Sequence, residues 1–150
     1  MTLNFPDPSL SPLVIVDDCE DDIFLMRHRL REGGIANPIV AFDSTHEAMA
    51  YLEVMHAGRA KPAFVFIDIK LPRDEGFELI GHVRELSDWE DVRIVVATSS
   101  NDDADLQRAL DLHVDGYLIK FPPADLIAEF VLHGPWFAVP QRQSLLVAAS

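Results

Sequence analysis

Short, nearly unbroken runs of apolar residues constrain the fold of this chain more than any other feature of its sequence. Four of them, LVIV, AFVFI, RIVVA and GYLI, lack the alternation of polar and apolar residues that marks a strand with one solvent face. Strands of this kind are buried on both faces, as in a parallel sheet covered by helices. In open parallel sheets, ligands bind beyond the carboxyl ends of the strands. The residues that follow these runs are therefore the first candidates for a functional site.

Each run ends beside a residue that suits metal or phosphate chemistry. Asp17 and Asp18 follow the first run, Asp68 the second, Thr98 the third and Lys120 the fourth. Carboxylates that lie close together repel one another unless a cation compensates them, and Mg²⁺ (or Mn²⁺) is a hard cation that prefers such oxygen ligands. An aspartate near bound Mg²⁺ can attack a phosphoryl group, while an ammonium and a hydroxyl stabilise the charge that develops. The pattern predicts one site for a divalent cation and a phosphoryl group.

The remaining sequence predicts strands and helices in strict alternation. The strands are expected at 13–16, 38–42, 63–67, 92–97 and 117–119, and the helices at about 23–32, 44–55, 77–86, 102–113 and 124–132. Right-handed crossovers then give an α/β fold, a doubly wound five-stranded parallel sheet. With the flavodoxin-like strand order 2-1-3-4-5, the first and third strands are neighbours, and Asp17 and Asp18 lie beside Asp68.

Length and composition limit the possible classes of protein. The 150 residues suit one domain, for which we expect a lead-in at 1–11, a folded domain at 12–133 and a tail at 134–150 that serves dimerisation or docking. A formal net charge of -13 disfavours nucleic acid as a partner. No apolar stretch is long enough to span a membrane, the N-terminus lacks the pattern of a secretion signal, and a single cysteine cannot form an intramolecular disulfide. We expect a cytoplasmic protein.

Taken together, these motifs resemble the receiver domain of two-component response regulators. The resemblance covers roughly residues 12–133. It rests on the acidic pair Asp17-Asp18, on Asp68 within DIKLPRDEG, on Thr98 followed by Ser99, and on Tyr117 three positions before Lys120. Each motif is weak alone, but the combination is specific.

The resemblance implies a role for each of these residues. Asp68 is the expected phosphoacceptor, served by a sensor histidine kinase or a phosphotransfer protein. Asp18, Asp68 and the backbone carbonyl of Lys70 are expected to bind Mg²⁺ directly, and Asp17 to bind it through a water. Thr98 and Lys120 are expected to contact the phosphoryl group. Thr98 and Tyr117 form the expected switch pair, which changes the surface of the fourth helix, fifth strand and fifth helix.

A finer resemblance concerns partners. The stretch DDIFLMRHRL and the aromatic tail are similar to small stand-alone receivers, including those that serve bacteriophytochrome-type kinases. A stand-alone receiver passes its signal through protein contacts, so we expect a homodimer formed through the fourth helix, fifth strand and fifth helix or through the C-terminal tail. Such a protein is a phosphoacceptor in signal transduction and not an enzyme.

Two other functions fit parts of the pattern. A Mg²⁺-dependent phosphohydrolase of the haloacid dehalogenase type also forms an aspartyl phosphate, but it usually carries a second aspartate two residues after the nucleophile, where this chain has Lys70. A non-phosphorylated interaction domain would keep the fold without the chemistry, and the intact acidic set argues against it. The chain also departs from the receiver pattern at Phe121, because receivers commonly have proline directly after the lysine.

Several residues also have a purely structural interpretation. Asp17-Asp18 alone could begin a helix, Thr98 could cap one, and Tyr117 could be a half-buried strand aromatic. We expect Cys19 to be a small packed side chain beside the acids. Arg27, Arg29 and Arg31 form either a solvated helix face or a kinase-docking face.

Overall fold

The computed structural model describes residues 11–133, 136–139 and 145–148. The strands are β1 (Leu13–Val16), β2 (Ile39–Phe42), β3 (Phe64–Ile67), β4 (Arg93–Thr98), β5 (Gly116–Ile119), β6 (Trp136–Val139) and β7 (Leu145–Ala148). The helices are α1 (Glu20–Glu32), α2 (Thr45–Ala57), α3 (Glu75–Arg84), α4 (Asp103–Asp111) and α5 (Ala124–His133), and a short 3₁₀ turn, η1 (Pro72–Asp74), precedes α3. The ten elements predicted from sequence are all present, with ends shifted by a few residues.

One sheet organises the molecule, with the strand order β2-β1-β3-β4-β5-β6-β7. The first five strands are parallel, which confirms the predicted order 2-1-3-4-5. The sheet has two more strands than predicted, because β6 pairs parallel with β5 and β7 pairs antiparallel with β6. These two strands come from the segment assigned to a tail. Most of the predicted lead-in and the rest of that tail lie outside the described residues.

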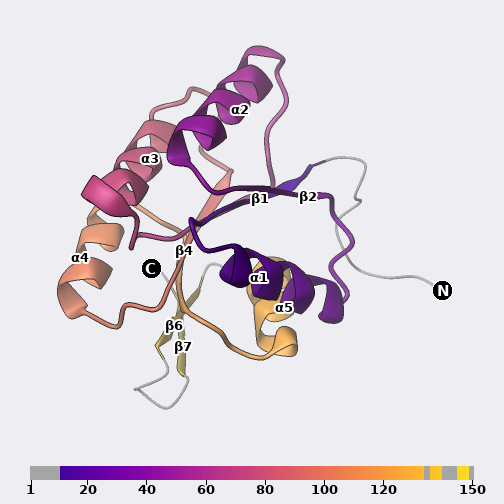
Figure 1. Cartoon of the computed structure of the whole chain (residues 1–150), viewed down its shortest axis with the longest axis vertical. Coiled ribbons are helices and arrows are strands. Elements are labelled where there is room, and N and C mark those ends of the chain that lie inside the picture. Colours follow the sequence, from indigo (N-terminus) through magenta and orange to yellow (C-terminus); the bar gives the residue numbers. More distant parts are fainter. Residues whose placement is uncertain (1–10, 134–135, 140–144, 149–150) are drawn as a thin grey trace.

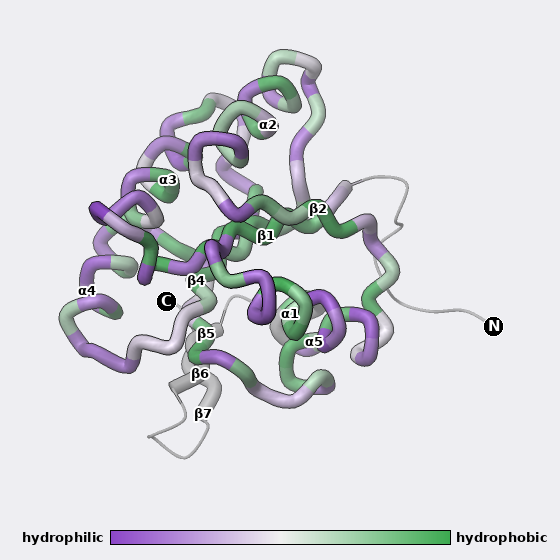
Figure 2. The backbone as a smooth tube through the Cα atoms, in the orientation of Figure 1, coloured by the Kyte–Doolittle hydropathy of each residue, from purple (hydrophilic) through white to green (hydrophobic). Residues whose placement is uncertain are grey.

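Helices cover both faces of the sheet in two groups (Figure 1). Helices α2, α3 and α4 lie on one face, and α1 and α5 lie together on the other. Successive strand residues point to opposite faces, so Val14 and Val16 enter the first core while Leu13 and Ile15 enter the second. Both cores are apolar, which is why the runs show no alternation; Figure 2 shows the hydrophobic residues concentrated on the central strands. None of the helices in the described ranges is long and apolar enough to cross a membrane.

Single residues determine where α2 begins and how closely α1 approaches α5. The Ser44 hydroxyl accepts a hydrogen bond from the Glu47 N–H at 3.2 Å, which caps α2 as its sequence predicted. At the end of α1, a Cβ on Gly33 would lie 2.8 Å from both the Ala124 carbonyl oxygen and the Ala128 Cβ. Glycine at this position therefore allows α1 and α5 to pack in direct contact.

The three arginines of α1 contact the protein itself. Arg27 donates to the Ile39 carbonyl at 3.2 Å and Arg29 to the Pro122 carbonyl at 2.9 Å. Arg31 donates to the carbonyls of Ile35 and Asn37, both at 2.8 Å. These side chains satisfy backbone acceptors in neighbouring loops, a role that neither of the two sequence interpretations included.

The expectation for Cys19 was wrong, because its side chain is exposed. Cys19 is the residue that precedes α1, and its backbone N–H donates to Asp17 Oδ1 at 3.0 Å. This turn directs the Cys19 side chain away from the packed acids and into solvent.

Candidate functional site

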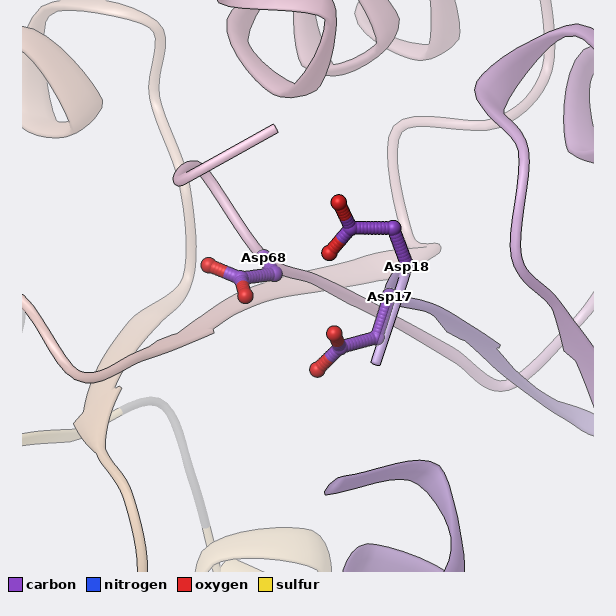
Figure 3. A group of neighbouring side chains, drawn as sticks. All are labelled: Asp17, Asp18 and Asp68. Carbon is purple, nitrogen blue, oxygen red and sulfur yellow. The ribbon is translucent and has the colours of Figure 1, made fainter. Parts of the chain in front are cut away.

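The site lies at the carboxyl ends of β1 and β3, which are neighbouring strands. Their register pairs Val16 with Ile67, so Asp17 and Asp68, the next residues of each strand, lie side by side. The ladder continues past the strands, since the Asp68 N–H donates to the Val16 carbonyl at 3.0 Å. Asp18 projects from the same turn, and Figure 3 shows the three carboxylates facing a common space. One carboxylate oxygen from each residue lies within 4.8 Å of the others.

Burial differs among the three acids. Asp17 and Asp68 are 4% and 7% exposed, whereas Asp18 is exposed. Two of the carboxylates are thus held in a poorly solvated place, where their charges need compensation. A cavity of about 330 Å³ lies beside Asp18, between the start of α2 and η1.

Lys120 supplies the positive charge. Its Nζ lies 2.5 Å from Asp17 Oδ2, 2.9 Å from Asp22 Oδ2 and 3.0 Å from Asp68 Oδ2. The lysine side chain is only 5% exposed. Lys120 follows β5, and its backbone N–H donates to the Thr98 carbonyl at 2.9 Å, which holds the end of β5 against β4. Lys120 and the two buried acids therefore form one charge cluster, as the sequence predicted.

Burial and neighbouring charges shift the pKa values of Asp17 and Lys120. Burial raises the pKa of Asp17, although hydrogen bonds from Lys120 and the Cys19 N–H act in the opposite direction. Burial alone would lower the pKa of Lys120, but hydrogen bonds to Asp17 and Asp22 and the charge of Asp68 outweigh burial and raise it. Lys120 is thus firmly charged at neutral pH. One ammonium still does not balance the carboxylates around it, which leaves the site short of positive charge.

The donor set fits a hard divalent cation. Asp17, Asp18 and Asp68 offer only carboxylate oxygens, which suit Mg²⁺ or Mn²⁺ and not a metal that prefers thiolate or imidazole. Within the described part of the chain, no second group of three or more His, Cys, Asp or Glu residues comes as close together. The acidic triad is therefore the place where this protein would hold a metal.

Thr98 and Tyr117 are linked through Ser100. Thr98 is fully buried at the end of β4, and its Oγ1 accepts a hydrogen bond from the Ser100 N–H at 3.3 Å. The Tyr117 hydroxyl donates to the Ser100 carbonyl at 3.3 Å. The Ser100 hydroxyl in turn donates to Asp105 Oδ2 of α4 at 2.6 Å. A movement of the Thr98 hydroxyl would therefore affect both Tyr117 and α4 through Ser100.

Tyr117 is more buried than a half-buried strand aromatic, at 1% exposure. Its ring lies in the core beneath α2, α3 and α4. Burial, which outweighs the hydrogen bond to Ser100, raises the pKa of Tyr117 to about 12. The phenol is neutral under ordinary conditions.

Lys70 and Phe121 both have a defined geometry beside the site. The Lys70 N–H donates to Asp68 Oδ1 at 2.9 Å, so this residue orients the central carboxylate through its backbone while its side chain is exposed. The Lys120-Phe121 peptide bond is cis. The Phe121 ring centroid lies 5.7 Å from Lys120 Nζ, and the ring packs against the core under α1 and α5. Phe121 does not keep Lys120 from the acids.

Sequence reasoning missed Asp22. It lies in the first turn of α1 beside Glu20 and Asp21, and acids at this position are explained equally well by the helix dipole. Only the direction in which α1 leaves the sheet brings Asp22, and not its two neighbours, within hydrogen-bonding distance of Lys120.

Sequence reasoning also missed the role of Gly76. A Cβ there would lie 2.5 Å from the Asp68 carbonyl oxygen. The first turn of α3 thus rests directly on the backbone of the central aspartate. The DEG triplet of the loop was a signal for this contact, but it did not indicate which part of the chain would be approached.

Comparisons with known proteins agree with this geometry. Residues 13–131 match the family model described as the response regulator receiver domain. The chain is 28% identical over 118 residues to the response regulator Rcp1 of Synechocystis sp., covering 76% of this chain and 80% of that one. The structure is similar to the phosphorylated cyanobacterial phytochrome response regulator RcpA, with a TM-score of 0.67, 25% identity, and 82% and 89% of the two chains covered. It is also similar to the bacteriophytochrome response regulator AtBRR, with a TM-score of 0.68, 29% identity, and 85% and 94% covered.

Proposed function

The chain belongs to the response regulator receiver family of two-component signalling systems, and from that premise we propose that it accepts a phosphoryl group on Asp68 from a sensor histidine kinase. One observation carries the proposal most directly. Asp68 lies with two further carboxylates and a buried ammonium at the carboxyl edge of the sheet. Structural stability gives no reason to gather like charges there.

The transfer is an in-line displacement at phosphorus. A carboxylate oxygen of Asp68 forms the new bond to phosphorus as the bond to the histidine nitrogen of the donor breaks, and the electron pair returns to the imidazole. Lys120 stabilises the negative charge on the phosphoryl oxygens. Asp18, Asp68 and the Lys70 carbonyl would hold Mg²⁺ directly and Asp17 would hold it through a water; the cation supplies further charge neutralisation. The hydrogen bond from the Lys70 N–H to Asp68 Oδ1 orients the carboxylate for this attack.

Thr98 and Tyr117 then carry the signal away from the site. The Thr98 hydroxyl turns to donate to a phosphoryl oxygen, which weakens its contact with the Ser100 N–H. Because Ser100 also contacts Tyr117 and Asp105, its movement repacks the aromatic side chain and the start of α4. The added phosphoryl charge thus favours one of two packing arrangements of Tyr117 and α4.

The similarity to phytochrome response regulators supports a phytochrome-type kinase as the partner. Signal output is proposed to run through a homodimer that uses the α4, β5 and α5 surface or the C-terminal strands β6 and β7. Sedimentation with and without beryllofluoride tests this assembly. A monomer in both conditions would exclude it.

The phosphoacceptor is tested by incubation with Mg²⁺ and either a small phosphodonor or beryllofluoride. The wild type is expected to bind one equivalent, and Asp68→Asn, which keeps the size of the side chain but not its nucleophilic charge, is expected to bind none. Equal responses of the two proteins would contradict the proposal. Sustained turnover of phosphate esters would indicate a phosphohydrolase instead.

A further inference from the structure

Asp22 contacts the lysine of the site but does not belong to the acidic triad. Its Oδ2 lies 2.9 Å from Lys120 Nζ, on the side of the ammonium that faces α1. Its side chain is 30% exposed, whereas those of Asp17 and Asp68 are 5% and 8% exposed. Among the three carboxylates that contact Lys120 in the described part of the chain, Asp22 is therefore the one with substantial contact with water.

All three N–H groups of the Lys120 ammonium are already used in hydrogen bonds. It carries three N–H groups, and Asp17, Asp22 and Asp68 accept from it at 2.5, 2.9 and 3.0 Å. Phosphorylation neutralises the Asp68 carboxylate, so its hydrogen bond from Lys120 can pass to one phosphoryl oxygen. A second contact between Lys120 and the phosphoryl group requires that Asp17 or Asp22 give way. Asp22 gives way at the least cost, because water can replace the ammonium around a partly exposed carboxylate.

We propose that Asp22 is a positioning residue that holds Lys120 in the resting site and yields its hydrogen bond to the incoming phosphoryl group. This inference rests on the proposed phosphoacceptor function. Asp22 then has opposite effects on two ligands. Its negative charge favours the cation at the triad, and it opposes the phosphoryl anion, both directly and by competing for Lys120.

The test removes the charge of Asp22 and keeps its shape. In Asp22→Asn the amide oxygen can still accept from Lys120. Mg²⁺ affinity, measured by calorimetry, is expected to fall by about three- to tenfold, and beryllofluoride affinity at saturating Mg²⁺, measured by fluorine NMR, to rise by about the same factor. Asp21→Asn is the matched control. It removes an equal charge from the same exposed helical turn, away from Lys120, and both affinities should change less than twofold.

In Asp22→Asn the Mg²⁺ affinity should fall and the beryllofluoride affinity should rise. These opposite changes distinguish a positioning role of Asp22 from a merely structural one. A loss of both affinities, or no change in either, would overturn the inference. Asp22→Ser is a second neutral variant that carries the same expectation if the asparagine variant folds poorly. Wild-type protein that fails to bind beryllofluoride would instead overturn the phosphoacceptor function, so the two failures are distinguishable.

Discussion

The ammonium nitrogen of Lys120 lies 3.0 Å from Oδ2 of Asp68, across 52 positions of sequence. Both side chains are almost fully buried, and each follows a parallel strand of the same sheet. The pair is part of a cluster in which carboxylates outnumber the ammonium. The stability and the chemistry of this protein are therefore coupled at one place.

Removal of Lys120 should destabilise the protein by leaving buried carboxylates without a counter-charge. Lys120→Met is expected to lower the free energy of unfolding by about 3–5 kcal/mol in EDTA, because Asp17 and Asp68 then repel each other in a poorly solvated site. Urea denaturation measures the change. Mg²⁺ should restore more stability to the variant than to the wild type, since the cation replaces the missing charge. Equal effects of Mg²⁺ on the two proteins would argue against a metal at the triad.

A methyl group at Gly76 should disturb the central aspartate. Gly76→Ala places a Cβ 2.5 Å from the Asp68 carbonyl oxygen and 3.0 Å from the Ile69 Cα, and we expect a loss of about 1–3 kcal/mol together with weaker beryllofluoride binding. Gly81→Ala is the control on the same helix. Nothing lies within 4 Å of its added Cβ, so this variant should gain about 0.5–1 kcal/mol from helix propensity. Similar effects of the two substitutions would refute the proposed contact.

Arg84 should be important for stability at the opposite end of the sheet. It donates to Asp115 Oδ2 at 2.5 Å and to the carbonyls of Val92 and His113 at 2.9 and 3.0 Å. Arg84→Met removes the donor from both carbonyls and leaves Asp115 Oδ2 with only the Ile94 N–H, and thermal or urea unfolding should show a loss of roughly 2 kcal/mol. The exposed pair between Arg73 and Glu75 provides the comparison, and Arg73→Met should change stability by less than about 0.5 kcal/mol. Comparable losses in both variants would show that the hydrogen bonds of Arg84 contribute no more than an exposed ion pair.

Tyr117 should make the protein sensitive to strongly alkaline pH. Its folded-state pKa of about 12 lies above the unfolded value of 10, so the stabilisation is complete below pH 10 and is lost as pH rises through 12. Each pH unit in this window should cost up to about 1.4 kcal/mol. Unfolding by urea at pH 9, 10 and 11 measures the slope. Tyr117→Phe should flatten it, and an unchanged slope would assign the effect to other groups.

Much of the fold was predictable because its signals are local. The apolar runs around Val14, Val65 and Val95 specify strands buried on both faces, and Ser44 specifies the start of α2 through a cap within four residues of chain. The strands β6 and β7 were not predicted. Their apolar residues lie in a short segment after the last expected helix, and such an isolated pair of strands becomes stable only when a partner such as β5 is already in place.

The sequence by itself determined the chemistry available to this protein: carboxylates at 17, 18 and 68, a hydroxyl at 98 and an ammonium at 120, each at the end of a buried run. Only the tertiary structure decided how these groups are used. It selected Asp22 from three consecutive acids as a partner of Lys120 and placed Gly76 against Asp68. Helix directions and close backbone contacts depend on the packing of distant segments against one sheet, and no local pattern in the chain encodes them.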